Sequence, residues 1–197
     1  MIAIVDYGAG NLQSVCNAFA RLETPVQVVR DSEGLRAASK VILPGVGHFG
    51  QMTRALDELL LRDALLSRIS AGVPFLGICL GMQALYEGSD EAPDDNGLGL
   101  LAGRIHRFDA DLRVPHMGWN NVEALRPSKL LANTGESPYF YFANSFYAPV
   151  GPDTVVTCTY GVPFSAVVER ANVFGVQFHP EKSGAAGLRV LQNFVEL

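Results

Sequence analysis

A cysteine between two glycines is the most chemically suggestive feature of this sequence. Gly77-Ile78-Cys79-Leu80-Gly81 directly follows the apolar run Val73–Leu76. The pattern Gly-x-nucleophile-x-Gly after a strand is typical of a nucleophile elbow, where only glycine fits beside the reactive residue. Because the helix-forming segment Met82–Tyr86 follows, we expect Cys79 at a helix N-terminus, where the dipole and free N–H groups favour a thiolate. The alternative is a small buried cysteine beside a glycine turn.

A thiol nucleophile needs a base, and the base needs a group that orients it. The chain has four histidines, His48, His106, His116 and His179. Only His179 has an orienting carboxylate at short range, in Val176–Glu181. Glu181 projects to the same side as His179 if the backbone stays extended, and it would fix the imidazole tautomer. The pattern therefore predicts a Cys79–His179–Glu181 triad, with an ordinary surface strand end as the alternative for His-Pro-Glu alone.

Acyl transfer also needs hydrogen-bond donors for the oxyanion that forms on the substrate. The elbow supplies one donor, the backbone N–H of Leu80. We expect a second donor from Pro44-Gly45-Val46-Gly47. This segment follows an apolar run and should lie at the same carboxyl edge of the sheet as the elbow. A plain tight turn is the alternative.

Alternating strand and helix patterns in the first half must position these residues. Strands are expected over Ile2–Val5, Val26–Arg30, Lys40–Leu43 and Val73–Gly77. Helices are expected over Asn11–Leu22 and over Met52–Ser70, where Leu56, Leu59 and Leu60 have helical spacing. Strands separated by helices imply βαβ units and a mostly parallel sheet that is covered on both faces.

The second half is instead rich in short β patterns. These runs are Gly103–Phe108, Tyr139–Ala143, Thr154–Tyr160, Ala166–Glu169 and Val173–Phe178. They suit antiparallel strands added to the sheet. Ala185–Glu196 reads as a closing helix, and the acidic stretch Ser89–Gly97 as an exposed, mobile loop. We therefore predict one α/β domain over residues 1–197.

Composition excludes several classes of function. A net charge of −5 without a lysine or arginine run gives no support for nucleic-acid binding. The three cysteines, Cys16, Cys79 and Cys158, lack paired spacing, which indicates reduced thiols in the cytoplasm and no zinc site. No apolar segment approaches the roughly 20 residues of a membrane span, and the N-terminus lacks the basic region of a signal peptide. Gly8-Ala9-Gly10-Asn11 lacks the third glycine of a dinucleotide fingerprint and is taken as a tight turn.

Taken together, these segments resemble the class I, triad-type glutamine amidotransferases. More narrowly, they resemble the glutaminase subunits of imidazole glycerol phosphate synthase, which acts in histidine biosynthesis. The resemblance runs through Asp6–Asn11, Leu43–Gly47, Leu76–Gln83, Pro115–Asn120 and Phe174–Ser183. The elbow and His-Pro-Glu are shared by the wider class, whereas Pro-Gly-Val-Gly and Pro-His-Met-Gly-Trp-Asn point to this subunit.

The resemblance implies a three-layer amidotransferase fold and hydrolysis of glutamine without a metal or cofactor. Cys79 would attack the amide carbon, while His179 acts as base and then as acid. The resemblance makes Gln83 a substrate-binding candidate, and Glu87, one helical turn later, could assist. Backbone groups of Ser145 and Phe146 would also contact the substrate.

The resemblance also implies that the ammonia passes to a partner, a (β/α)₈-barrel synthase subunit, within a heterodimer. It would be used there to form imidazole glycerol phosphate and an aminoimidazole carboxamide ribotide. The implied interface candidates are Asn11, Trp119, Tyr141 and Lys182. A buried core position is the alternative for Trp119.

One segment departs from the family pattern. Where Phe-Val-His-Ser-Tyr is usual, this chain has Phe142-Ala143-Asn144-Ser145-Phe146. Asn144 cannot titrate as histidine does, and Phe146 lacks a hydroxyl, so we expect retained chemistry with altered affinity or activation. Three alternatives stay open: a cysteine hydrolase of the α/β-hydrolase type, a glutaminase of vitamin B6 synthesis, and a non-catalytic partner protein. The first places its acid before the histidine, whereas Glu181 follows His179.

Overall fold

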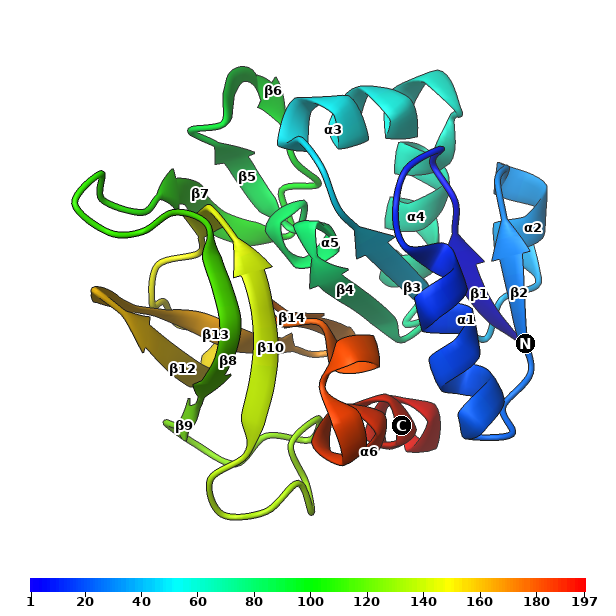
Figure 1. The fold of residues 1–197 in the computed structure, drawn as a ribbon. Helices are drawn as coiled ribbons and strands as arrows, with labels where there is room; N and C mark the ends of the chain where they lie inside the picture. The colour runs from blue at the N-terminus through cyan, green and yellow to red at the C-terminus, as the bar shows by residue number, and fades with distance from the viewer.

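An eight-stranded sheet organises the chain, which the computed structural model describes from residue 1 to residue 197 (Figure 1). Five strands are parallel, in the order β2-β1-β3-β4-β14. Their bounds are Ile2–Val5 (β1), Val26–Val29 (β2), Lys40–Gly45 (β3), Phe75–Cys79 (β4) and Val173–Val176 (β14). Antiparallel strands extend the sheet: Val162–Arg170 (β13), Thr154–Tyr160 (β12) and Glu123–Ala124 (β9). The predicted sheet is confirmed.

Helices cover both faces of this sheet, and strand alternation explains why. Ile2 and Ile4 belong to one buried apolar cluster, while Ala3 and Val5 belong to another, because successive strand residues point to opposite faces. The first cluster includes side chains from Leu12–Arg21 (α1) and Gly184–Glu196 (α6). The second includes side chains from Ser32–Arg36 (α2), Phe49–Glu58 (α3) and Leu61–Ser70 (α4). This is the predicted three-layer arrangement.

Two smaller sheets from the second half lie beside the carboxyl edge of the parallel strands (Figure 1). One has the order β11-β7-β5-β6, with bounds Phe146–Tyr147, Leu101–Arg107, Tyr86–Ser89 and Ala92–Asn96. The other pairs His116–Asn121 (β8) with Tyr139–Asn144 (β10) in antiparallel register. A short 3₁₀ turn, Pro180–Lys182 (η1), leads into α6. None of the helices has the length and apolar character needed to cross a membrane.

The single helix expected over Met52–Ser70 is wrong. The chain forms α3 and α4, separated at Leu60, which has a left-handed backbone with φ of +54°. Leu56 is buried, but Leu59 and Leu60 are 40% and 75% exposed. The leucine spacing is that of a continuous helix, but the chain changes direction at Leu60. The change of direction lets α4 pack its own leucines into the core.

The helix expected after the elbow is also shorter than predicted. It covers only Leu80–Gln83 (α5), and Tyr86 already begins β5. The chain at the end of α5 is held by the β5–β7 sheet, since the N–H groups of Leu100 and Leu101 both donate to the carbonyl of Leu85. The helix stops because its continuation is recruited as a strand.

Candidate active site

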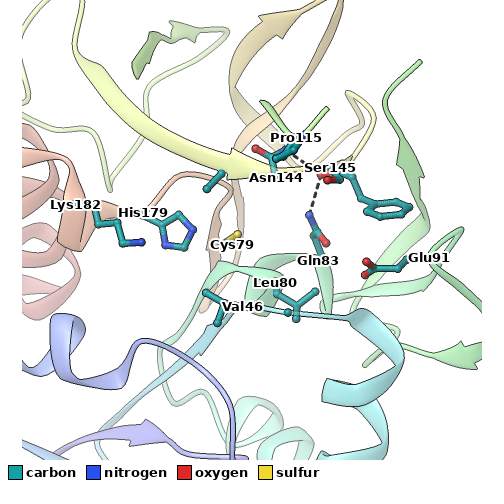
Figure 2. A pocket seen from close by; sticks show the side chains of 13 residues that line it. Val46, Cys79, Leu80, Gln83, Glu91, Pro115, Asn144, Ser145, His179 and Lys182 are labelled. Atoms are coloured by element: carbon teal, nitrogen blue, oxygen red, sulfur yellow. Dashed lines mark hydrogen bonds between the residues drawn. The ribbon is translucent and has the colours of Figure 1, made fainter. Parts of the chain in front are cut away.

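Cys79 occupies the sharp turn that its flanking glycines predict. It is the last residue of β4 and the cap of α5, with φ of +54° and ψ of −110°. A side chain other than glycine rarely adopts positive φ, and such strain clusters at functional sites. The residue is 6% exposed and faces a cavity of about 320 Å³. Figure 2 shows its sulfur beside the imidazole of His179.

The glycines of the elbow are required by close packing. A Cβ on Gly81 would overlap the carbonyl oxygen of Leu43 in β3, and one on Gly77 would overlap the carbonyl oxygen of Gly81. A Cβ on Gly45 would lie 2.8 Å from the Cβ of Leu80. Gly45 is paired with Cys79 in the β3–β4 register but does not line the cavity. The glycines therefore allow the elbow and β3 to touch backbone to backbone.

We predict that Gly81→Ala lowers the free energy of unfolding by about 3 kcal/mol or more, because a methyl group has no space against the β3 backbone. Gly151→Ala is the matched control, since a Cβ there would meet nothing within 4 Å. It should change stability by no more than about 0.5 kcal/mol. Urea denaturation of both variants measures the difference, and equal stabilities would contradict the packing argument.

His179 and Glu181 are joined as predicted, but by a different backbone path. The Nδ1 atom of His179 lies 2.8 Å from Oε1 of Glu181, and the two side chains are only 4% and 2% exposed. The expected extended backbone is wrong, because Pro180 starts the turn η1. Ser183 completes this turn by donating from its hydroxyl to the carbonyl of His179 at 2.6 Å, and by accepting from the N–H of Tyr141.

The charge state of His179 follows from its two neighbours. Burial lowers the pKa of His179, but the negative charge of Cys79 and hydrogen bonds with Cys79 and Glu181 outweigh it and raise the pKa to about 10. At neutral pH the imidazole is therefore protonated beside the sulfur. A protonated imidazole beside a cysteine sulfur is the kind of arrangement that can activate a cysteine nucleophile.

The expected oxyanion segment borders the cavity next to the elbow. Val46, Gly47 and Leu80 all line it, as do Ser145, Phe146 and Lys182 (Figure 2). The hydroxyl of Tyr7 donates to the carbonyl of Val46 at 3.4 Å. Burial raises the pKa of Tyr7 to about 12, so the phenol keeps the proton for this bond. The β1–α1 turn thus supports the backbone from which we expect the second oxyanion donor.

Gln83 belongs to a buried chain of amides that the sequence analysis did not foresee in full. Its Nε2 atom donates to the carbonyl of Phe146 at 2.9 Å and to Oε1 of Gln177 at 3.0 Å. Gln177 in turn places its Nε2 atom 3.6 Å from the sulfur of Cys79. The missed signal was period-two spacing, since Gln177 precedes His179 by two residues at the end of β14.

The divergent residue Asn144 also holds the segment after β10. Its Nδ2 atom donates to the carbonyl of Phe146 at 2.9 Å, whereas its Oδ1 atom is buried without a partner. Asn144 is paired across the strands with His116, which stacks on Phe142 and Tyr160. Burial lowers the pKa of His116 to about 4, so this neighbour is neutral. The side chain of Asn144 therefore positions the Phe146 carbonyl.

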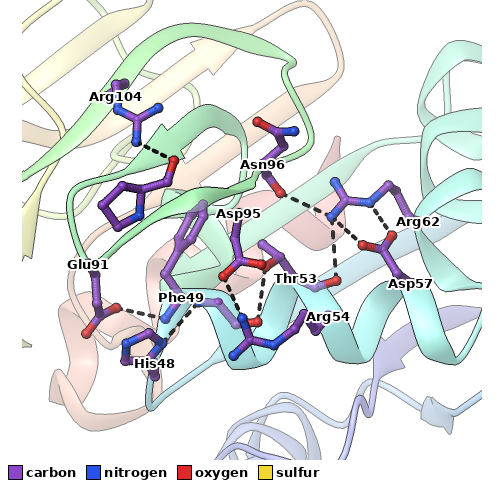
Figure 3. Close-up of polar contacts among 12 residues, drawn as sticks. His48, Phe49, Thr53, Arg54, Asp57, Arg62, Glu91, Asp95, Asn96 and Arg104 are labelled. Atoms are coloured by element: carbon purple, nitrogen blue, oxygen red, sulfur yellow. Dashed lines mark hydrogen bonds and ion pairs between the residues drawn. The ribbon is translucent and has the colours of Figure 1, made fainter.

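The acidic stretch Ser89–Gly97 is not the mobile loop that was expected. It contributes β6 and is fastened to α3 by polar contacts (Figure 3). Asp95 forms a 2.6 Å ion pair with Arg54, and Arg62 donates to the carbonyl of Asn96. The carboxylate of Glu91 accepts from the N–H of Phe49 at the start of α3, at 2.7 Å. These contacts with α3 and α4 order the segment.

Glu91, and not Glu87, lies at the cavity. Because α5 is short, Glu87 falls in β5 and does not share a helix face with Gln83. It is exposed, and its carboxylate accepts from the N–H of Gly103 at 2.9 Å. Glu91 lines the cavity opposite His179 (Figure 2). Its place at the cavity could not be predicted from the sequence, because the acidic stretch has the composition of a loop.

Of the interface candidates, Lys182 lines the cavity and Tyr141 is joined to the site through its carbonyl, which accepts from the N–H of His179. Trp119 is 56% exposed, so the alternative of a core position is wrong. Its ring meets that of Tyr141 edge to face at 6.2 Å, and Nζ of Lys182 lies 5.8 Å from the Tyr141 centroid. Asn11 caps α1, which packs beside η1. The neighbouring Met117 is 65% exposed, which gives this surface an apolar character.

The fold and this site define a class I glutamine amidotransferase. Residues 3–197 match the family model described as Glutamine amidotransferase class-I. A solved structure titled as a glutamine amidotransferase has a TM-score of 0.79 at 22% identity, covering 100% of this chain and 98% of that one. PurLQS from Thermotoga maritima has a TM-score of 0.79 at 20% identity, covering 99% of this chain and 97% of that one. These two structures share the fold.

Proteins with higher sequence identity to this chain identify the family within this class. The chain is 49% identical to imidazole glycerol phosphate synthase subunit HisH of Methanothermobacter thermautotrophicus, over 100% of this chain and 98% of that protein. It is 44% identical to the subunit HisH of Methanocaldococcus jannaschii, over the full length of both. The chain therefore belongs to the HisH family of glutamine amidotransferase subunits.

Proposed function

We propose that this chain hydrolyses the side-chain amide of L-glutamine and passes the ammonia to a synthase subunit. That subunit would form imidazole glycerol phosphate and aminoimidazole carboxamide ribotide in histidine biosynthesis. The observation that carries the proposal is the buried Cys79–His179–Glu181 constellation beside a cavity of about 320 Å³. The chain's place in the HisH family supports the substrate. Three free thiols fit a cytoplasmic enzyme.

The geometry supports a two-stage reaction. The thiolate of Cys79 attacks the amide carbon, and N–H groups of Leu80 and the Gly45–Gly47 segment stabilise the resulting oxyanion. His179 gives its proton to the leaving nitrogen, so that ammonia departs and a thioester remains. His179 then takes a proton from water, which attacks the thioester carbon. Collapse of this second intermediate expels the thiolate, releases glutamate and restores the imidazolium.

Glu91 provides the negative charge that an amino-acid substrate needs. One carboxylate oxygen is held by the N–H of Phe49. We propose that the carboxylate binds the α-ammonium of glutamine. Gln83 uses its Nε2 atom on Phe146 and Gln177, which leaves its Oε1 atom to accept from the substrate.

We predict that Glu91→Gln raises the KM for glutamine about tenfold to a hundredfold, because it removes the charge while keeping an oxygen for Phe49. The kcat should change by less than about threefold. Glu87→Gln, which alters a carboxylate outside the cavity, should leave both constants unchanged. Steady-state glutaminase kinetics of the two variants make the comparison. Equal KM values would show that Glu91 does not bind the ammonium group.

The surface around the site suits a partner that takes the ammonia. Trp119 and Met117 are exposed apolar side chains next to Tyr141 and Lys182. Aromatic residues of this kind are enriched in interfaces. We propose that they, together with Asn11, contact a (β/α)₈-barrel synthase subunit in a heterodimer. Docking over the mouth of the cavity would keep ammonia from solvent.

The proposed function is tested by purifying the chain with a barrel-type synthase and measuring glutamate release. Activity should be low for the chain alone and rise when the synthase and its substrate are added. Full activity of the isolated chain would contradict this coupling. Ester turnover without glutamine turnover would identify a different cysteine hydrolase.

A further inference from the structure

The fully buried side-chain amide of Gln177 lies between Cys79 and Gln83. Gln177 has no exposed surface, and its backbone N–H donates to the carbonyl of Ala166. Its side chain has two polar contacts, an Oε1 atom that accepts from Gln83 at 3.0 Å and an Nε2 atom 3.6 Å from the sulfur of Cys79. Neither the triad nor the substrate contacts described above assign this residue a role.

Burying the Gln177 amide at this position costs free energy of folding, which its hydrogen bonds must offset. Gln177 stands between Val176 and Phe178, both completely buried. Burying a polar side chain costs free energy unless it finds partners, and an apolar residue of the same length would avoid that cost. Both partners of the Gln177 side chain belong to the active site.

The hydrogen-bond chain fixes which end of the amide faces the sulfur. The carbonyl of Phe146 accepts only, so Gln83 must turn its Nε2 atom toward it. The same nitrogen also donates to Gln177, so Gln177 must offer its oxygen to Gln83. An N–H group of Gln177 is therefore directed at Cys79. The orientation of the Gln177 amide is thus fixed by the carbonyl of Phe146, at the other end of this hydrogen-bond chain.

We propose that Gln177 is a hydrogen-bond donor to the thiolate of Cys79, stabilising its negative charge before attack and again when the tetrahedral intermediate formed by water addition to the thioester collapses and expels the thiolate. Its effect on glutamine turnover rests on the proposed function. A hydrogen bond to the charged form favours that form. The neutral sulfur of the thioester accepts more weakly, so the bond strengthens whenever the thiolate must be held or expelled.

The test uses Gln177→Met, which keeps the length and removes the donor. Gln27→Met, on the exposed face of the edge strand β2, is the matched control. The rate of iodoacetamide alkylation at pH 7 is followed for the peptide that contains Cys79. Cys16, on the opposite side of the sheet from α3, is the internal reference. We expect Cys79 to react about threefold to fivefold more slowly and Cys16 at an unchanged rate.

Glutaminase kinetics with the partner give a second readout. The kcat of Gln177→Met should fall about tenfold, while the KM for glutamine stays within about threefold. Alkylation of Cys79 at the parent rate, with the loss confined to a higher KM, would overturn the proposal, because Gln177 would then only support Gln83. If the Met variant does not fold, Gln177→Leu gives the same test.

Failure of this inference is distinguishable from failure of the proposed function. Alkylation needs neither glutamine nor the partner. A parent protein that does not turn over glutamine would refute the proposed function and leave the alkylation result standing. A parent that does, with unchanged Cys79 alkylation in the variants, would refute the role of Gln177 alone.

Discussion

Cys79→Ala is expected to reduce glutamine hydrolysis by about 10⁴-fold or more when the chain is assayed with its partner. Removing the nucleophile of a triad eliminates the covalent route and leaves only the assistance of oxyanion donors and binding. The measurement is glutamate release at saturating glutamine. The variant should keep its affinity for the partner, because Cys79 is 6% exposed and lies inside the cavity.

Cys16→Ala is the control for this experiment. Cys16 is a half-buried thiol on α1 that packs against the apolar cluster formed with α6. Its loss should leave hydrolysis within about twofold of the parent protein. Hydrolysis by Cys79→Ala at the parent rate would remove the catalytic assignment and favour a non-catalytic partner protein.

Glu181→Gln is expected to lower kcat by about 10²-fold to 10⁴-fold. The carboxylate holds Nδ1 of His179 at 2.8 Å, and an amide in its place no longer stabilises the imidazolium or selects its tautomer. The pKa of His179 should fall from about 10, because one of the groups that raise it is lost. NMR titration of the imidazole together with kcat measurements tests both effects. Glu196→Gln, at the exposed end of α6, is the control.

The same pKa has a consequence for stability. The folded pKa of about 10 lies above the ordinary value of 6.5, so protonated His179 stabilises the folded state fully below pH 6.5. That contribution is lost as pH rises through about 10. In Glu181→Gln, part of this stabilisation should already be absent at pH 6. Urea denaturation of the parent and the variant at pH 6 and at pH 10 would detect the difference.

Equal kcat values in the parent and Glu181→Gln would exclude an orienting role of Glu181.

The positions of Cys79, His179 and Glu181 were predictable because the sequence signals for them are local. The glycines beside Cys79 predict a sharp turn, because no larger residue fits there. The parallel sheet brings the carboxyl ends of β3, β4 and β14 to one edge. Val46 was expected near the elbow for this reason, whereas His179 was identified by the carboxylate of Glu181 two residues later. The backbone path from His179 to Glu181 was not predictable, since Pro180 permits either an extended strand or a turn.

The errors arose where tertiary contacts decide between local options. Leu60 adopts a left-handed backbone without a glycine or proline to announce it. The α5 helix ends early because the β5–β7 pairing takes the following residues. Because residues 86–89 form a strand and not a helix, Glu87 lies outside the cavity and Glu91 lines it instead. The partners of Gln177 lie 94 and 98 residues away in sequence, which no local pattern reports.

The hydrogen bond between Glu91 and Phe49 has a consequence for discrimination among amides. Phe49 begins α3 directly after Gly47 and His48, so one carboxylate is shared between the backbone that follows the oxyanion segment and the proposed ammonium site. A simple amide without an α-amino group would leave that carboxylate with its bond to Phe49 but without an ammonium partner. The proposed site for the α-ammonium therefore lies next to the backbone that follows the expected oxyanion segment. The enzyme would therefore discriminate against the many other primary amides of a cell mainly by binding them weakly.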